Sequence, residues 1–350
     1  MENTADIKSI QKEKRKVKLV KFFLSSEFLA ILFIVILSLI TYFVNENFFT
    51  WKNIFTLLRN CSFIGIMAIG QALIIMTGEM DLSVGSVSAL SSVVFGLVCI
   101  WNSWPIWAGL LLAVLVAVAV GALNGFLMLK VGVMKWVATM ATSSFCASVA
   151  TYLTLGVPIT PVPQELVTFA NSAVLKGLFT TLSGGTYKKG LSVLFVIFVV
   201  LVAIAEIVLR YTKYGRMIQA SGISSDSAYM AGVNVRRVKW ITLMFVSVLA
   251  FIGGLLSNLR NAVILPGGLG GADFKTIAAC YIGGIGFVGS SGSVLGLFLG
   301  VVLIQLIENS MTAIGWDPNV QIAIIGVLVM LVLSIDVFKR RYMASRIDLV

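Results

Sequence analysis

Ten apolar segments, separated by polar or charged breaks, run along the 350 residues of this chain. They cover residues 28–44, 54–76, 82–101, 104–129, 133–153, 191–209, 239–259, 274–288, 293–314 and 320–338. A helix of about 20 residues crosses a hydrocarbon core of about 30 Å, and most of these segments are close to that length. Inside a bilayer each backbone N–H and C=O needs a partner within the protein, which favours helices. The sequence therefore predicts an all-α membrane protein with about ten transmembrane helices, in a domain spanning residues 28–338.

The composition excludes several classes of protein. Apolar residues make up 59% of the chain and charged residues 12%, which rules out a soluble enzyme, a secreted disulfide scaffold and a disordered chain. The sequence contains no histidine, and its four cysteines lie far apart, so neither a His-based catalytic triad nor a His- or C-x-x-C-ligated metal site is expected. No G-x-x-x-x-G-K-[ST] motif occurs either, so the chain has no P-loop for hydrolysing ATP. We expect no catalytic residues, no metal and no cofactor.

The distribution of basic residues predicts the topology. Of the 26 Lys and Arg residues, 19 lie in or beside segments that face the same side if the N-terminus is inside. The positive-inside rule therefore puts both termini in the cytoplasm, with a basic segment 1–27 and a tail 339–350. The basic segment has two interpretations, a helix lying on anionic lipid or a solvated tail. Because inner loops account for the net charge of +11, membrane lipid is the expected partner of these charges and nucleic acid is not.

A long polar segment, residues 156–190, falls on the outer side in this topology. It contains three prolines and a weakly apolar stretch, residues 166–182, which is expected to form a short helix against the outer face. Loops of this length in a compact domain usually have a function.

A second long polar segment, residues 211–238, falls on the cytoplasmic side. Within it, either Ser224 or Ser225 is suited to cap a short helix that continues through Met230. Gly232 then suits the left-handed conformation that commonly ends a helix.

This inner loop carries a family resemblance. The stretch GRMIQASGISSDSAYMAGVNVRRVK resembles the cytoplasmic coupling loop of the ribose-type ABC importer permeases. Three further stretches resemble motifs of that family: GEMDLSVGSVSAL (78–90), VMKWVATMATSSF (133–145) and GADFKTIAACYIGGIGFVGSSGSVLG (271–296). The four stretches occur in the family's order and together span most of residues 60–338.

The resemblance implies a fold and a set of partners. The fold is a ten-helix core in which helices 2–5 and 7–10 form an inverted repeat. The partners are a second permease copy, identical or paralogous, ABC ATPase subunits on the inside, and an external sugar-binding protein. The implied function is ATP-driven import of a monosaccharide, a pentose, hexose or related furanose, across the bacterial cytoplasmic membrane, with ATP hydrolysed by the partner subunits.

Two groups of residues are candidates for these roles. The candidate contacts with the ATPase are Ser225, Asp226, Ala228, Tyr229, Met230 and Gly232. In this interpretation Ala228 and Gly232 are small enough to let the loop seat deeply, while Tyr229 or Met230 provides apolar contact.

The candidate translocation path consists of polar residues within or beside the spans. They are Gln71, Asp81, Asn124, Asn258 and Asn309. Hydrogen bonding between helices is an equal alternative for the amides. Asp81 with Ser83 is also suited to cap the N-terminus of the next helix.

The acidic residues near the spans support a second hypothesis, an ion-coupled secondary transporter. Glu79, which replaces a glycine usual in the family, Asp81 and Glu308 are the carboxylates that would relay protons or bind Na⁺. Glu206 most simply pairs with Arg210, one helical turn later.

Pairs of glycines four residues apart predict close contacts between helices. Gly121 and Gly125 form one such pair, and Gly292, Gly296 and Gly300 continue the same spacing in another segment.

Overall fold

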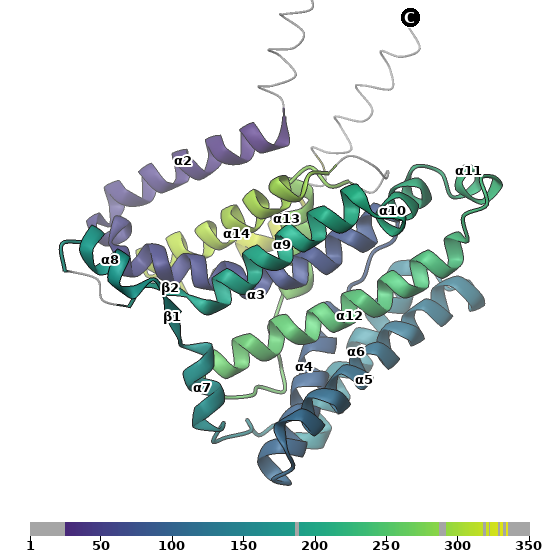
Figure 1. Ribbon diagram of the computed structural model, residues 1–350, viewed down its shortest axis with the longest axis horizontal. Helices are drawn as coiled ribbons and strands as arrows, with labels where there is room; N and C mark the ends of the chain where they lie inside the picture. Colours follow the sequence, from purple (N-terminus) through teal and green to yellow (C-terminus); the bar gives the residue numbers. More distant parts are fainter. Residues whose placement is uncertain are drawn as a thin grey trace, which may run out of the picture.

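The computed structural model describes residues 25–185, 189–286 and 292–317, and residues 320–321, 323–327, 330–331 and 334. Almost all of the predicted basic segment 1–27 and the whole of the tail 339–350 lie outside these residues. The described part of the chain is mostly helical (Figure 1).

Thirteen α-helices, three short 3-10 or π-helical turns and one small hairpin make up the labelled elements of the described residues. The helices are α2 (Ser26–Val44), α3 (Trp51–Met76), α4 (Val84–Gly96), α5 (Ile106–Phe126), α6 (Lys135–Thr154), α7 (Gln164–Ala170), α8 (Lys176–Leu182), α9 (Val193–Tyr211), α10 (Lys213–Ile223), α11 (Ser225–Met230), α12 (Val235–Arg260), α13 (Ala272–Ile282) and α14 (Val294–Ile314). One 3-10 turn, Glu46–Phe49, precedes α3, and π-helical turns extend α4 through Leu97–Trp101 and α5 through Leu127–Val131. The strands β1 (Ala173–Val174) and β2 (Leu191–Ser192) pair antiparallel.

Seven of the ten predicted spans are confirmed as helices long and apolar enough to cross a membrane, counted over the described residues. They are α2, α3, α4 with its π turn, α5 with its π turn, α9, α12 and α14. The predicted span 133–153 forms α6, a helix of 20 residues rich in Ser and Thr that falls short of the hydropathy of the others. Between 320 and 334 the described residues are helical, which agrees with a tenth span.

The predicted span 274–288 is wrong as a complete crossing. Its helix, α13, has only 11 residues, about 16 Å in length, which is half of a hydrocarbon core. The helix ends at Gly283, and Gly284 adopts φ +83°, which turns the chain out of the helix.

The helices pack around a central pair formed by α3 and α12. α12 packs against α3, α4 and α5, whereas α3 packs against α12, α13, α14 and α9. α4 contacts α5 and α6, α13 contacts α14, and α2 lies on α14 at the edge of the bundle (Figure 1). Most of α6 is exposed apart from its contact with α4, so one side of the bundle is only thinly covered.

Glycines allow two of these helix contacts, as their spacing predicts. A Cβ added at Gly121 or Gly125 of α5 would collide with the backbone of α12 or with the ring of Trp240. A Cβ added at Gly300 of α14 would collide with the Ala279 carbonyl of α13.

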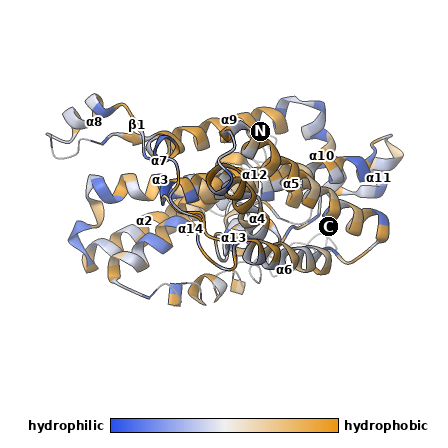
Figure 2. Cartoon of the chain, turned by 90° about the horizontal axis from the view of Figure 1, so that it is seen from below, coloured by the Kyte–Doolittle hydropathy of each residue, from blue (hydrophilic) through white to orange (hydrophobic). Residues whose placement is uncertain are grey.

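The polar elements occupy the two ends of the molecule. α10 and α11 lie at one end of the bundle, and α7, α8 and the β1–β2 hairpin lie at the opposite end (Figure 1). Figure 2 shows the apolar helices between these two more hydrophilic ends. The outer segment 156–190 thus contains two short helices and the first strand of the hairpin, where the sequence predicts one short helix.

Candidate functional site

The short helix α11 forms as predicted from the sequence. The Ser224 hydroxyl accepts a hydrogen bond from the Ser227 N–H at 3.1 Å, which caps the helix. At the other end the N–H of Gly232 donates to the Tyr229 carbonyl and the N–H of Val233 to the Ala228 carbonyl. With φ +84° at Gly232, these two bonds make a Schellman motif that closes the helix.

The outer side of α11 presents an apolar surface at the end of the molecule. Tyr229 is 72% exposed and Met230 is 87% exposed, and Asp226 beside them is exposed as well. Ala228 is 4% exposed and faces the chain's own interior, so it differs from the expected partner-facing position. Gly232 has open space around it.

α10 attaches this loop to the membrane helices. The Tyr214 hydroxyl lies 2.9 Å from the Thr242 hydroxyl and donates to the Val238 carbonyl at 3.2 Å, both in α12. Burial raises the pKa of the Tyr214 hydroxyl, so this side chain stays protonated and able to donate at neutral pH.

A buried ion cluster lies between the inner loop and the bundle. Glu79, in the loop between α3 and α4, is 3% exposed, and its Oε1 accepts a hydrogen bond from Lys239 of α12 at 2.7 Å. The ammonium of Lys135, at the start of α6, lies 3.1 Å from Oε2 and donates a hydrogen bond to the Gly78 carbonyl. Lys239 also donates to the Ser225 hydroxyl of α11 at 3.3 Å.

The predicted path residues do not form one lining. Gln71, Asp81 and Asn124 are fully buried and Asn258 is 7% exposed. Asn309 of α14 exchanges hydrogen bonds of 2.9 Å with Asn53 of α3, as the interhelical alternative describes. The structure brings only Asp81 and Asn124 together, through Ser83.

This shared contact joins the loop before α4 to α5. Asp81 accepts hydrogen bonds from the N–H and the hydroxyl of Ser83, and Asn124 donates to the same hydroxyl at 2.9 Å. Asp81 therefore holds the turn ahead of α4 and does not cap the helix itself.

The residue that caps α4 is Asp273, a role that the sequence does not predict. Its Oδ1 accepts a hydrogen bond from the Gly85 N–H in the first turn of α4. Asp273 itself lies in the first turn of α13, so the starts of two short helices meet at this contact. The only signal in the sequence is an acidic residue at the start of a predicted helix. That signal does not reveal that the carboxylate accepts a hydrogen bond from the N–H of a different helix.

Of the other two carboxylates named for ion coupling, Glu308 also forms an ion pair. Glu308 lies 2.5 Å from Lys275 and accepts a hydrogen bond from Gln305. Glu206 pairs with Arg210 at 2.8 Å, as predicted. Among the described residues, no group of three or more acidic, Cys or His side chains is arranged to hold a metal.

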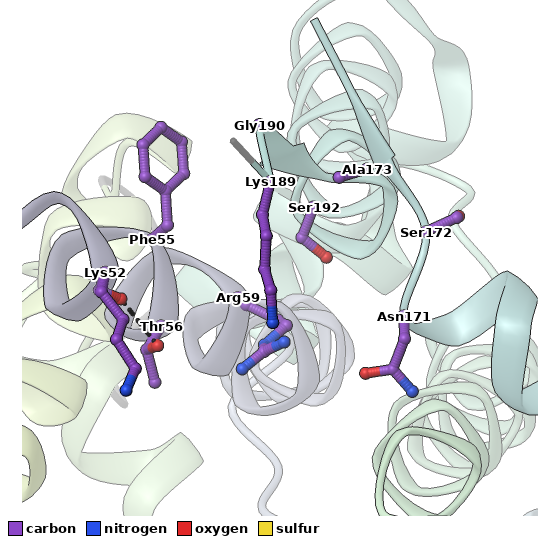
Figure 3. Close-up of a pocket in the computed structure, with 10 residues that line it drawn as sticks. All are labelled: Lys52, Phe55, Thr56, Arg59, Asn171, Ser172, Ala173, Lys189, Gly190 and Ser192. Atoms are coloured by element: carbon purple, nitrogen blue, oxygen red, sulfur yellow. Dashed lines mark hydrogen bonds between the residues drawn. The ribbon is translucent and has the colours of Figure 1, made fainter. Parts of the chain in front are cut away.

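A basic pocket of about 430 Å³ opens at the end of the molecule opposite α11 (Figure 3). Its polar lining includes Lys52, Arg59, Asn171, Ser172, Lys189 and Ser192. All three charged residues in the described lining are cations, which suits an anionic group.

Seven helices of the described residues are long and apolar enough to cross a membrane, and they define a multi-pass membrane protein. A capped helix with exposed apolar side chains lies at one end of this bundle. The family model described as "Branched-chain amino acid transport system / permease component" matches residues 53–333. The chain belongs to this family of permease components.

Curated relatives match most of the chain. The ribose import permease of Escherichia coli (strain K12) is 28% identical over 297 residues, which cover 84% of this chain and 88% of the relative. The fructose import permease of Rhizobium meliloti is 27% identical over 331 residues, covering 93% and 90%. The xylose transport permease of Haemophilus influenzae is 24% identical over 365 residues, covering 88% and 95%. No solved structure matches the chain.

The chain is therefore a multi-pass membrane permease component, related to sugar permeases of bacterial ABC importers, and is not itself an ATPase. This assignment does not support the alternative of a self-sufficient ion-coupled carrier. The paired state of Glu79 and Glu308 agrees with the assignment, because neither carboxylate is left free for an ion.

Proposed function

We propose that this chain forms the translocation path of an ATP-driven importer for a monosaccharide in the bacterial cytoplasmic membrane. An external binding protein delivers the sugar, and ATPase subunits bind the inner loop. The observation that carries the proposal is α11, a capped helix with exposed Tyr229 and Met230, in a chain related to ribose, fructose and xylose permeases. A six-residue helix is marginal alone in water, and a groove in a partner would stabilise it.

The α11 end is cytoplasmic and the α7–α8 end external. The distribution of Lys and Arg supports this orientation. Residues 211–238 then form the coupling loop and residues 156–190 the outer loop, within a permease domain of residues 28–338.

The packing supports an inverted repeat of helices 2–5 and 7–10. In this repeat α3 corresponds to α12, α4 to α13 and α5 to α14. The contacts of α12 with α4 and α5 then correspond to the contacts of α3 with α13 and α14. Likewise, the contact of α4 with α5 corresponds to the contact of α13 with α14. The fourth pair consists of α6 and the tenth predicted span, whose described residues between 320 and 334 are helical.

A second copy, identical or paralogous, covers the exposed side of α6, and the sugar passes between the two copies. Ser144, Ser148 and Thr151 are exposed and recur at helical spacing along one face of α6. Hydroxyls on an otherwise apolar wall bind a neutral sugar weakly, so that the sugar can also dissociate. Of the predicted path residues, Asp81 and Asn124 then contribute from behind this face, because α4 and α5 are the helices that pack on α6.

The basic pocket at the outer end receives acidic side chains of the external binding protein. Two of its cations, Lys52 and Arg59, lie in the first half of α3, and the third, Lys189, lies just before β2. One docked carboxylate would therefore contact both elements. Complementary charge of this kind mainly accelerates and orients association.

The test is co-expression of this chain with an ABC ATPase and an external sugar-binding protein from its source organism. We expect the ATPase to co-purify, and proteoliposomes to take up one of D-ribose, D-fructose or D-xylose only with ATP and the binding protein. Uptake by the chain alone, driven by a proton or sodium gradient, would overturn the proposal.

A further inference from the structure

The carboxylate of Glu79 binds two lysines from distant segments, and one of these lysines also contacts α11. Lys239 lies in the second turn of α12, and Lys135 is the first residue of α6. Glu79 itself belongs to the loop 77–83 between α3 and α4. The hydroxyl of Ser225 adds α11, through its 3.3 Å contact with the Lys239 ammonium. We call Ser225, Lys239, Glu79 and Lys135 the inner ion cluster.

The cluster is buried where it joins α12 to the loop. Glu79 is 3% exposed and Lys239 is 11% exposed, whereas Lys135 is 51% exposed. A buried charge pair resists separation, because each partner would be left without compensation in a medium of low polarity. The surface pair Glu206–Arg210, at 34% and 65% exposure, has no such constraint.

The loop that Glu79 anchors controls the position of several helices. Two residues further on, Asp81 and Ser83 hold the turn before α4 and bind Asn124 of α5. α4 then begins, and its Gly85 N–H is bound by Asp273 of α13. A displacement of the loop 77–83 is therefore transmitted to α4, α5 and α13.

We propose that Glu79 transmits movement of α11 to the membrane helices, as a positioning residue of the transport cycle. Docking or withdrawal of the ATPase shifts α11, the shift passes through Ser225 and Lys239 to Glu79, and the loop 77–83 moves with it. Lys135 carries the same movement to α6, which lines the proposed path. The inference rests on the proposed function, because it needs α11 to be the ATPase contact.

Two cysteine reporters test this transmission in the reconstituted complex of the chain with its ATPase. Ser227→Cys reports on α11, and Met80→Cys reports on the loop 77–83; Ser227 is exposed and Met80 half-buried. All four native cysteines are buried, so a maleimide labels the reporters preferentially. We expect the non-hydrolysable analogue AMP-PNP to change both labelling rates at least threefold.

Glu79→Gln should separate the two reporters. The response at Ser227 persists and the response at Met80 is lost, since the link between them is broken. The matched control is Glu206→Gln, which removes a carboxylate of an ion pair toward the same end of the bundle, and there both responses remain. An undiminished Met80 response in Glu79→Gln overturns the inference.

A double variant distinguishes transmission from a merely structural role. Glu79→Gln with Lys239→Met leaves no lone buried charge, so thermal stability should recover relative to Glu79→Gln alone. The Met80 response should stay absent, and its recovery would show that the pair serves folding only. A Ser227 reporter that ignores AMP-PNP in the otherwise unchanged chain overturns the proposed ATPase contact itself, and the inference with it.

Discussion

Replacing Gly232 by valine tests whether the geometry of α11 sets the coupling to the ATPase. Gly232 has φ +84° and nothing within 4 Å of an added Cβ, so the substitution acts through backbone strain alone. A left-handed conformation costs a residue with a Cβ about 1–2 kcal/mol, and a β-branched residue is at the upper end.

The strain falls on a helix that has little stability to lose. α11 has six residues, held by the Ser224 cap and by the two hydrogen bonds at Gly232 and Val233. A loss of about 1–2 kcal/mol reduces the population of the docking conformation roughly 5- to 30-fold, since 1.4 kcal/mol is tenfold. Apparent affinity for the ATPase falls by the same factor, because binding must first restore the minor conformation.

The assay is ATP hydrolysis stimulated by the sugar-loaded binding protein, measured against ATPase concentration in proteoliposomes. Gly232→Val should raise the half-saturating ATPase concentration roughly 5- to 30-fold, with normal insertion of the chain in the membrane. Gly232→Asn should remain close to wild type, because asparagine tolerates the left-handed region.

Gly315 provides the matched control. It ends α14 with φ +85°, also has nothing within 4 Å of an added Cβ, and lies at the opposite end from α11. Gly315→Val imposes the same strain without touching the inner loop, so coupling should be unchanged. Equal losses in the two valine variants, or no loss in Gly232→Val, would refute the reasoning.

Three further predictions follow from the ends and the packing of the bundle. A cysteine at Ser227 should be labelled by an impermeant maleimide only from the cytoplasm and one at Thr181 only from outside; the reverse labelling contradicts the topology. Lys52→Glu in the basic pocket should reduce stimulation by the binding protein and flatten its dependence on salt, while basal ATP hydrolysis persists; an unchanged salt dependence counts against that pocket. Gly300→Ala should lower the free energy of unfolding in detergent by about 1–3 kcal/mol, since its methyl group meets the α13 backbone. Gly177→Ala, which meets nothing within 4 Å, should be neutral or stabilising, and equal effects of the two substitutions would contradict the close packing of α13 and α14.

Local sequence is enough to predict most of the helices. Hydropathy over about 20 residues predicts the seven confirmed spans, because insertion depends on the average transfer energy of a segment and little on its neighbours. The same average fails at 274–288, where apolar residues continue past Gly283 but the helix does not. There the glycines change the backbone direction without changing the hydropathy.

The helix α11 was also predictable, since its signals are local. A serine cap, six residues and a left-handed glycine all act within one turn of the residues they affect. The sequence did not predict which side of this helix faces outward. Ala228 is buried and Tyr229 exposed because α10 and α12 determine how α11 is presented.

The sequence by itself therefore determined the membrane class, most of the spans and the capped inner helix, all of which depend on residues close together in the chain. Only the tertiary structure decided the partners of the buried charges. Lys239 and Glu79 are 160 residues apart, and Asp273 and Gly85 are 188 apart. The sequence contains each of these groups, but a charge or a free N–H is compatible with many partners. The choice is made when packing of α3, α4, α12 and α13 brings one partner within hydrogen-bond distance and excludes water from the rest.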